Sequence, residues 1–150
     1  MKKIVSLLFI LCFALNLSAQ KKIDGVEFLI DKDAAISVLK EKFGDPQSIL
    51  SDRIIFRNIA FDGEQFNEAI FFFDNKGRMY QVRLKSDYVN HAKAEDRMSK
   101  LGNKYSCIYK ITESENSDDG KFVVGYDING GRLFTISTFR NTCDLTFGPF

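Results

Sequence analysis

The chain has 150 residues, of which 21 are Lys or Arg and 20 are Asp or Glu, so its formal net charge is +1. Proteins that bind nucleic acids or anionic membranes depend on a pronounced excess of Lys and Arg. The balanced charge therefore argues against both kinds of partner, and the length suits one domain built around one core.

Residues 1–19 have the pattern of a cleavable signal peptide. A basic start at Lys2 and Lys3 precedes an apolar run over residues 4–15, and Ala19 supplies a small residue at the expected cut before Gln20. A membrane-spanning helix would need about 20 apolar residues. The sequence predicts export to the periplasm or the extracellular space, with no membrane span in the mature form.

Lipid attachment at Cys12 is a further alternative, but the bulky Ile10 and Leu11 before it are unsuited to that processing. After cleavage, the mature chain over residues 20–150 carries 19 basic and 20 acidic residues. We expect it to be a single α+β domain with a charge near −1.

Cys107 and Cys143 are the two cysteines of the predicted mature chain. An even pair in an oxidising compartment predicts a disulfide between them. A bridge closing a loop of this size would stabilise the fold by about 3 to 4 kcal/mol. Two independent buried thiols are the alternative.

The first half of the mature chain predicts one helix followed by strands. Asp31 and Asp33 can cap a helix over residues 34–43, and Gly44 and Pro46 follow it as stop signals. Tight turns then separate three segments with strand patterns. These predicted strands are residues 53–61, 65–73 and 78–85.

The second half predicts the same order. Residues 90–101 have a helical apolar pattern, with Gly102 at the stop position. Asn129-Gly130-Gly131 is a strong hairpin signal. The predicted strands are residues 105–112, 121–128, 132–140 and 143–147.

The two halves look like a tandem repeat, over about residues 23–86 and 87–150. Residues 73–82 resemble residues 126–136 with one inserted residue, although two unrelated tight turns could show the same likeness. The predicted fold class is α+β: one antiparallel sheet built from two tandem helix-plus-meander units, with both helices on one face.

This element order resembles the β-lactamase-inhibitor-protein-like fold and the related small outer-membrane assembly lipoproteins. The resemblance extends over residues 23–147 and includes the segment Gly25-Val26-Glu27-Phe28 before a capped helix. In those relatives the exposed sheet face or its edge engages another protein, which is the function that the resemblance implies. The chain lacks their lipidated cysteine, their fuller disulfide set and any Trp.

The alternation in residues 80–85 assigns the sheet faces. If Tyr80, Val82 and Leu84 face the helices, the repeat places Phe134 and Ile136 with them. Arg and aromatic residues carry much of the energy at protein interfaces, although an ordinary solvated face would look similar. The candidate partner-binding residues on the other face are Gln81, Arg83, Lys85, Thr135, Ser137 and Phe139.

The sequence contains no recognisable catalytic pattern. His91 is the single histidine, at the start of a predicted helix, and the acidic residues 113–120 lack the spacing of a calcium loop and predict a solvated loop. We therefore predict no catalytic residue, no metal and no cofactor, and a protein-binding module. The alternative is a cystatin-like or nuclear-transport-factor-like cone that holds a small ligand among Phe66, Ile70 and Phe72.

Overall fold

The computed structural model describes residues 21–117 and 120–150, so the predicted signal peptide lies outside the described residues. Within these ranges, no helix is long and apolar enough to cross a membrane. The elements in chain order are β1 (Lys22–Ile23), β2 (Val26–Glu27), α2 (Lys32–Phe43), β3 (Ser48–Ile49), β4 (Arg53–Phe61), β5 (Glu64–Phe73), β6 (Met79–Asp87), α3 (His91–Ser106), β7 (Lys110–Asn116), β8 (Gly120–Tyr126), β9 (Arg132–Phe139) and β10 (Thr142–Phe147).

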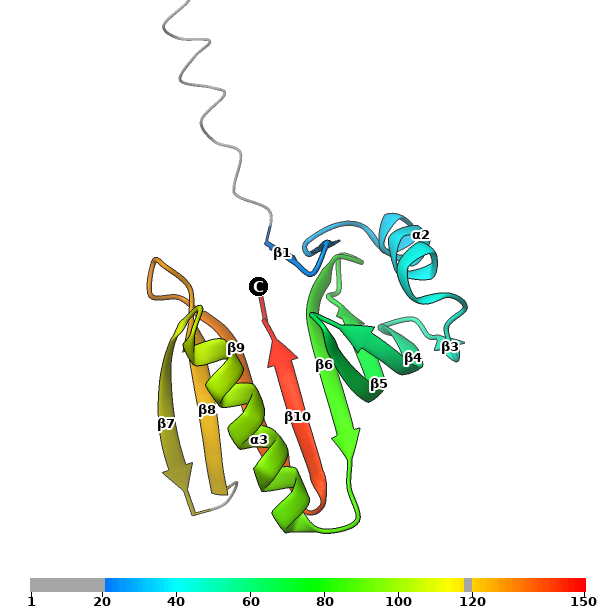
Figure 1. Ribbon diagram of the computed structural model, residues 1–150. Helices are drawn as coiled ribbons and strands as arrows, with labels where there is room; N and C mark the ends of the chain where they lie inside the picture. Colours follow the sequence, from blue (N-terminus) through cyan, green and yellow to red (C-terminus); the bar gives the residue numbers. More distant parts are fainter. Residues whose placement is uncertain (1–20, 118–119) are drawn as a thin grey trace, which may run out of the picture.

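Eight strands form one antiparallel sheet in the order β3-β4-β5-β6-β10-β9-β8-β7 (Figure 1). This is the order of two units, each a helix followed by four strands, whose last strands β6 and β10 pair at the centre of the sheet. The predicted α+β class, with tandem helix-plus-meander units in one antiparallel sheet, is confirmed. Residues far apart in the sequence therefore become neighbours along the line where the units meet.

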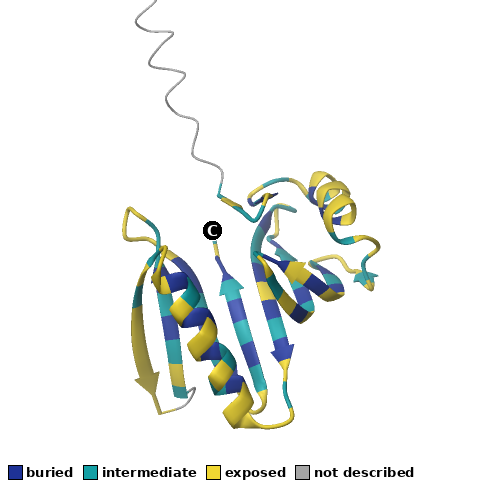
Figure 2. Cartoon of the chain, viewed as in Figure 1, coloured by how far each residue is buried: buried dark blue, intermediate teal, exposed yellow. Residues whose placement is uncertain are grey.

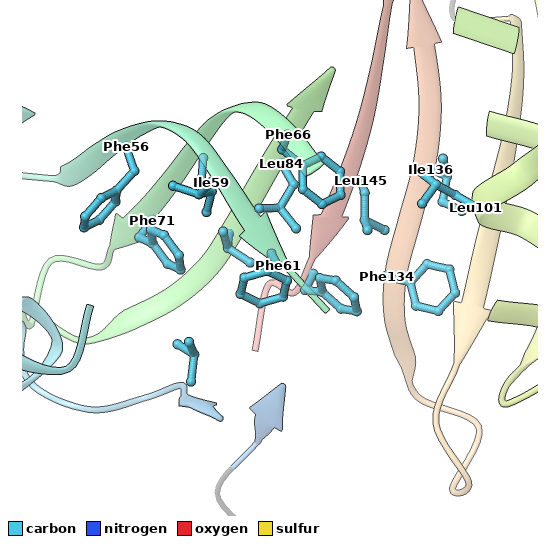
Figure 3. Close-up of a cluster of buried hydrophobic side chains, with 14 of the residues drawn as sticks. Phe56, Ile59, Phe61, Phe66, Phe71, Leu84, Leu101, Phe134, Ile136 and Leu145 are labelled. Atoms are coloured by element: carbon cyan, nitrogen blue, oxygen red, sulfur yellow. The ribbon is translucent and has the colours of Figure 1, made fainter. Parts of the chain in front are cut away.

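Both helices pack on the same face of the sheet through one aromatic core. The ring centroid of Phe43 in α2 lies 6.2 Å from that of Phe61, and Phe61 lies 6.0 Å from Phe147 in β10. Phe147 lies 6.0 Å from Tyr105 in α3, and Figure 3 shows Phe61 and Phe134 within this cluster. Burial of large aromatic side chains dominates core energetics, so the two units are stabilised as one body.

The C-terminal end of α2 agrees with the sequence prediction, whereas the helix starts at Lys32, two residues before the predicted Ala34, and the side chain of Asp31 makes no capping hydrogen bond. The helix begins after Asp31, which has the extended backbone of an N-cap residue. It ends at Gly44, whose φ of 80° suits glycine and whose N–H donates to the carbonyl of Lys40 at 2.9 Å.

The predicted end of the second helix at Gly102 is wrong, because α3 continues to Ser106. Its buried face runs on past the glycine to Tyr105, which is 1% exposed. A Cβ atom at Gly102 would lie 3.8 Å from Val123 in β8, so this glycine is a position of close packing inside the helix. Tertiary packing has overridden the local stop signal.

The strand predicted over residues 105–112 is also displaced, because residues 105–109 do not join it and β7 runs from Lys110 to Asn116. The predicted acidic loop from Glu113 is thus largely strand. Pairing with β8 along the whole of β7 supplies the backbone hydrogen bonds, and this outweighs the low strand propensity of Glu, Ser and Asn.

The buried positions of β4 change parity at Asn58. Ile54 and Phe56 are 1% exposed, whereas beyond Asn58 the buried residues are Ile59 and Phe61. Asn58 has a φ of 52°, in the left-handed region that Asn tolerates better than most residues. This local change of direction explains why the aromatic strands show no simple alternation in the sequence.

A register shift between β5 and β6 corrects the predicted position of Tyr80. Phe73 pairs with Met79, while Phe72 pairs with Gln81, so Tyr80 is an extra residue in the ladder. Met79 takes the fully buried position, at 0% exposure, and Tyr80 is half-buried. The predicted burial of Val82 and Leu84 is confirmed, since both are 0% exposed.

The two turns that suggested a repeat share the same hydrogen bonds. Oδ1 of Asp74 accepts from the backbone N–H groups two and four residues ahead, each at 2.9 Å, and Oδ1 of Asp127 does the same. The first turn joins the third and fourth strands of its unit, whereas the second joins the second and third. Their sequence likeness therefore reflects shared Asx-turn chemistry. The evidence for the repeat is the order of the helix and strands in each unit.

The predicted disulfide is wrong, because Cys107 and Cys143 are both free. Cys143 is buried in β10 opposite Ser86, four residues before Asn90 caps the start of α3. Cys107 is exposed after the last turn of α3. A helix of 16 residues spans about 24 Å, whereas bridged cysteines have Cα atoms within about 7 Å.

Candidate interaction surface on the open face of the sheet

The sheet face opposite the helices, which we call the open face, carries the six candidate partner-binding residues. Phe134 and Ile136 are 0% exposed on the helix side, as predicted, so the residues between them point the other way. The alternation of buried and partly exposed positions is visible along β6 and β10 in Figure 2. The six residues are Gln81, Arg83, Lys85, Thr135, Ser137 and Phe139.

Pairing across the three central strands arranges the open face in rows. Each row takes one residue from β6, one from β10 and one from β9, and so unites the two units. The rows are Arg83, Thr146 and Thr135 in the first and Lys85, Asp144 and Ser137 in the second.

Sequence reasoning missed the residues of β10 that complete these rows. The strand alternates cleanly, with Cys143, Leu145 and Phe147 buried and the polar residues between them half-buried. That period-two pattern was a signal that could have identified Asp144 and Thr146 as open-face residues. Their position between β6 and β9, in contrast, depends on how the two units pair.

A hollow of about 580 Å³ lies over the second row. It brings together four of the six predicted residues, whereas Gln81 and Thr135 lie outside it. Phe139 on its rim is 68% exposed. The predicted residues that line the hollow are Arg83, Lys85, Ser137 and Phe139, and residues that the prediction missed include Glu68, Ile70, Asp144 and Thr146.

Asp144 is the most unusual group in this hollow. Its Oδ1 atom is buried and has no hydrogen-bond partner among the described residues. Burial raises the pKa of Asp144 above its ordinary value, and this effect outweighs the opposing charges of Arg83 and Lys85. A buried acceptor without a donor is costly, so the folded chain retains an unfavourable group on this face.

Arg83 lies over an aromatic ring rather than beside a carboxylate. Its guanidinium carbon is 5.6 Å from the ring centroid of Phe72, and that of Arg53 is 5.4 Å from the same centroid. Within the described chain, Arg83 has no ion pair. Its side chain is therefore held in place by the ring and keeps its hydrogen-bond donors available.

Two pairs of opposite charges on the open face lie within the chain. Arg57 lies 2.9 Å from Glu68, and Lys85 lies 3.3 Å from Asp87. Exposed pairs of this kind contribute little to stability. They do reduce the charge that these four groups present to a partner. Among the described residues that line the hollow, the charged groups without an ion pair are Arg83, Arg140 and Asp144.

The three residues of the alternative ligand-binding prediction do not line a common cavity, because they lie on opposite faces of the sheet. Phe66 is 3% exposed on the helix side, where Arg97 of α3 lies 5.3 Å from its ring centroid. Ile70 and Phe72 belong to the open face, where they neighbour Arg83. The change of parity in this part of the sheet separates these side chains.

Groups with reactive chemistry are dispersed in the described chain. Within residues 21–117 and 120–150, no three His, Cys, Asp or Glu side chains form a group that could hold a metal ion. Nδ1 of His91 contacts the carbonyl of Arg140, and its Nε2 lies 3.6 Å from Glu95. Burial raises the pKa of Cys143 to about 12, which keeps this thiol protonated at neutral pH.

Comparisons of the chain with protein-family models, curated proteins and solved structures found no match. The functional interpretation therefore depends on the geometry of the open face.

Proposed function

We propose that the mature chain is an exported, non-enzymatic protein-binding module whose partner docks on the open face. The observation that carries the proposal is the buried Oδ1 atom of Asp144 on the open face, to which no residue of the described chain donates. A partner that supplies a donor to this atom would remove an energetic penalty of the free protein. The element order also resembles that of the β-lactamase-inhibitor-protein-like fold, whose members bind other proteins through their sheet, and this supports the proposed docking on the open face.

The surroundings of Asp144 indicate the chemistry of the partner. Arg83 offers unpaired donors suited to a carboxylate, and Phe139 offers an exposed ring, at 68% exposure. Arg and aromatic residues are enriched where binding energy is concentrated. We therefore expect a partner surface that brings a Lys or Arg side chain to Asp144 and a carboxylate to Arg83.

The partner can be captured by site-specific crosslinking in the native host. A photo-reactive residue replaces Ser137 on the open face, and a matched control replaces Val38, an exposed residue of α2. The proposal expects one protein to be crosslinked from Ser137 and not from Val38. Capture of the same proteins from both positions contradicts it.

The captured protein is then purified and titrated against variants of the mature chain. Arg83→Glu should weaken binding by at least about tenfold, since it places like charges together. Lys40→Glu on the exposed surface of α2 is the matched control and should bind as the parent does. Equal affinities of the Arg83→Glu variant and the parent would remove the open face from consideration.

A further inference from the structure

The edge of the sheet formed by β7 is exposed along its length. All seven residues except Ile111 are exposed, and β7 pairs with β8 alone (Figure 2). Alternate backbone N–H and C=O groups of such a strand point outward without a strand partner. The opposite edge, β3, has two residues, so β7 is the long open edge of this sheet.

A groove runs beside this edge on the helix side. It is a hollow of about 580 Å³ between α3 and the β7–β8 pair. Met98 and Gly102 of α3 line it together with Val123 of β8, and Glu113 and Glu115 line it on β7. An additional strand on β7 would place every second side chain over this groove.

Acidic side chains outnumber basic ones in the groove, which Glu113, Glu115 and Lys121 line. Glu113 and Glu115 are exposed and have no ion pair with a described residue. Lys121 of β8 is the basic residue that lines the groove, opposite Glu115 in the strand pairing. Glu95 of α3 and Glu115 both line a neighbouring hollow, together with Lys121 and Arg140. An incoming strand with basic side chains on its groove side would therefore be complementary in charge.

We infer that β7 is a second binding site, at which an extended segment of a partner protein adds a ninth strand to the eight-stranded sheet. The segment carries an apolar residue opposite Ile111 and basic residues opposite Glu113 and Glu115. Main-chain hydrogen bonds provide affinity, and the groove selects the side chains. This inference is independent of the proposed function on the open face.

A second copy of the chain fits this edge less well. Antiparallel pairing of two β7 strands about their midpoint would set Glu113 opposite Glu113, because it is the central residue of the strand. Like charges directly opposite each other destabilise a sheet. The same acidic residues that attract a basic segment therefore oppose self-association at the edge.

The test uses synthetic peptides and the mature chain. The probe is the heptapeptide Thr-Val-Thr-Lys-Thr-Lys-Thr, acetylated at its N-terminus and amidated at its C-terminus. A second peptide has the reversed sequence, so that parallel and antiparallel pairing are both tested. Titration is followed by amide resonances in nuclear magnetic resonance spectra. We expect shifts and slowed hydrogen exchange in β7, and a dissociation constant raised at least about tenfold in the Glu113→Lys, Glu115→Lys double variant.

Controls separate strand addition from general charge attraction. Glu41→Lys on α2 and Arg83→Glu on the open face should leave the peptide affinity unchanged. Two N-methylated peptides are compared, in each of which methyl groups block the backbone N–H groups along one edge of the probe. Their affinities should differ, because only one edge of the bound peptide faces β7. Equal binding of these two peptides, or shifts confined to the open face, overturns the inference. A dimer with β7 amides protected before peptide is added would assign the edge to a second copy and overturn it as well.

Discussion

The hydroxyl group of Tyr105 donates a hydrogen bond of 2.8 Å to Oδ2 of Asp62. Tyr105 belongs to α3 in the second unit, and Asp62 to the β4–β5 turn of the first. Glu64, beside this turn, lies 2.6 Å from Arg97 and 3.3 Å from Lys104, both in α3. The first unit is thus fixed to the helix of the second by buried and half-buried polar contacts as well as by the aromatic core.

Tyr105→Phe should reduce the free energy of unfolding by about 1.5 to 3 kcal/mol, the range for hydrogen bonds to charged groups. The substitution keeps the buried ring and leaves the carboxylate of Asp62 without this donor. Urea denaturation measures the loss. Tyr109→Phe is the matched control, since Tyr109 lies in the same aromatic cluster, 6.2 Å from Tyr105, and should change stability little.

Glu64→Gln should destabilise the chain more at neutral pH than at pH 3. Burial alone would raise the pKa of Glu64, but the hydrogen bonds and charges of Arg97 and Lys104 outweigh it and lower the pKa. The stabilising contribution is therefore present above the unfolded value of about 4.3 and is lost as the pH falls through the lower folded value. Urea denaturation at the two pH values measures this, and a loss of equal size at both would contradict it. Glu41→Gln, on the exposed surface of α2, is the control.

Sequence patterns predicted the elements whose burial follows a regular period. The alternation of Val82 and Leu84 in β6 identified the faces correctly, and the stop signal at Gly44 identified the C-terminal end of α2. The same reasoning failed at Gly102, where packing against Val123 keeps the helix going, and at Asn58, where a left-handed residue reverses the faces of β4. Local rules describe what a segment prefers, and tertiary contacts decided these two positions.

The candidate site was predicted only in part, because its centre joins the two units. Arg83 and Ser137 could be assigned to one face from their own strands. Asp144 lies between Lys85 and Ser137 because β6 pairs with β10, and no local pattern encodes that pairing. The cysteine prediction failed for the same reason. It relied on the even number of cysteines, whereas the length and direction of α3 hold the two thiols apart.

Gly125→Ala should destabilise the fold by about 1 to 3 kcal/mol, the usual range for overpacking. A Cβ atom at Gly125 would lie 2.1 Å from the ring of Phe134, which is fully buried and confined by Tyr105 and Phe147. Gly102→Ala is the matched control. Its Cβ atom would make an ordinary contact at 3.8 Å, so it should raise stability by roughly 0.5 to 1 kcal/mol through helix propensity.

Thermal denaturation of both glycine variants gives the comparison directly. Equal melting temperatures of the Gly125→Ala variant and the parent would mean that the Phe134 ring does not cover this position. A fall in the Gly102→Ala variant would mean that α3 lies closer to β8 than the distance to Val123 indicates.

The two cysteines should differ in reactivity. In the folded mature chain, the exposed Cys107 should react with a thiol reagent, whereas Cys143 should react after unfolding, because it is buried and its pKa is raised to about 12. Added reductant should leave the melting temperature unchanged. Absence of free thiols in the unfolded chain without reductant would instead establish a disulfide. Cys107→Ser removes the fast reaction and identifies its source.

Asp144→Asn should raise the melting temperature at pH 7 and not at pH 3. Burial, together with the negative charges of Asp87 and Glu68, raises the folded pKa of Asp144 despite Arg83 and Lys85. The contribution of the carboxyl group to stability is then fully present below the unfolded value of about 3.9 and is lost as the pH rises through the folded value. Asp96→Asn, at an exposed position of α3, is the control.

The same substitution should weaken partner binding if Asp144 accepts a donor from the partner. A residue that improves stability when replaced, and impairs binding at the same time, is retained for its function, because binding sites commonly trade stability for activity. Titration of the captured partner with the Asp144→Asn variant measures the second half of this expectation. A more stable variant that binds as tightly as the parent would show that the unpaired oxygen of Asp144 does not contact the partner. Arg83 and Phe139 would then be the residues of the open face left to account for binding.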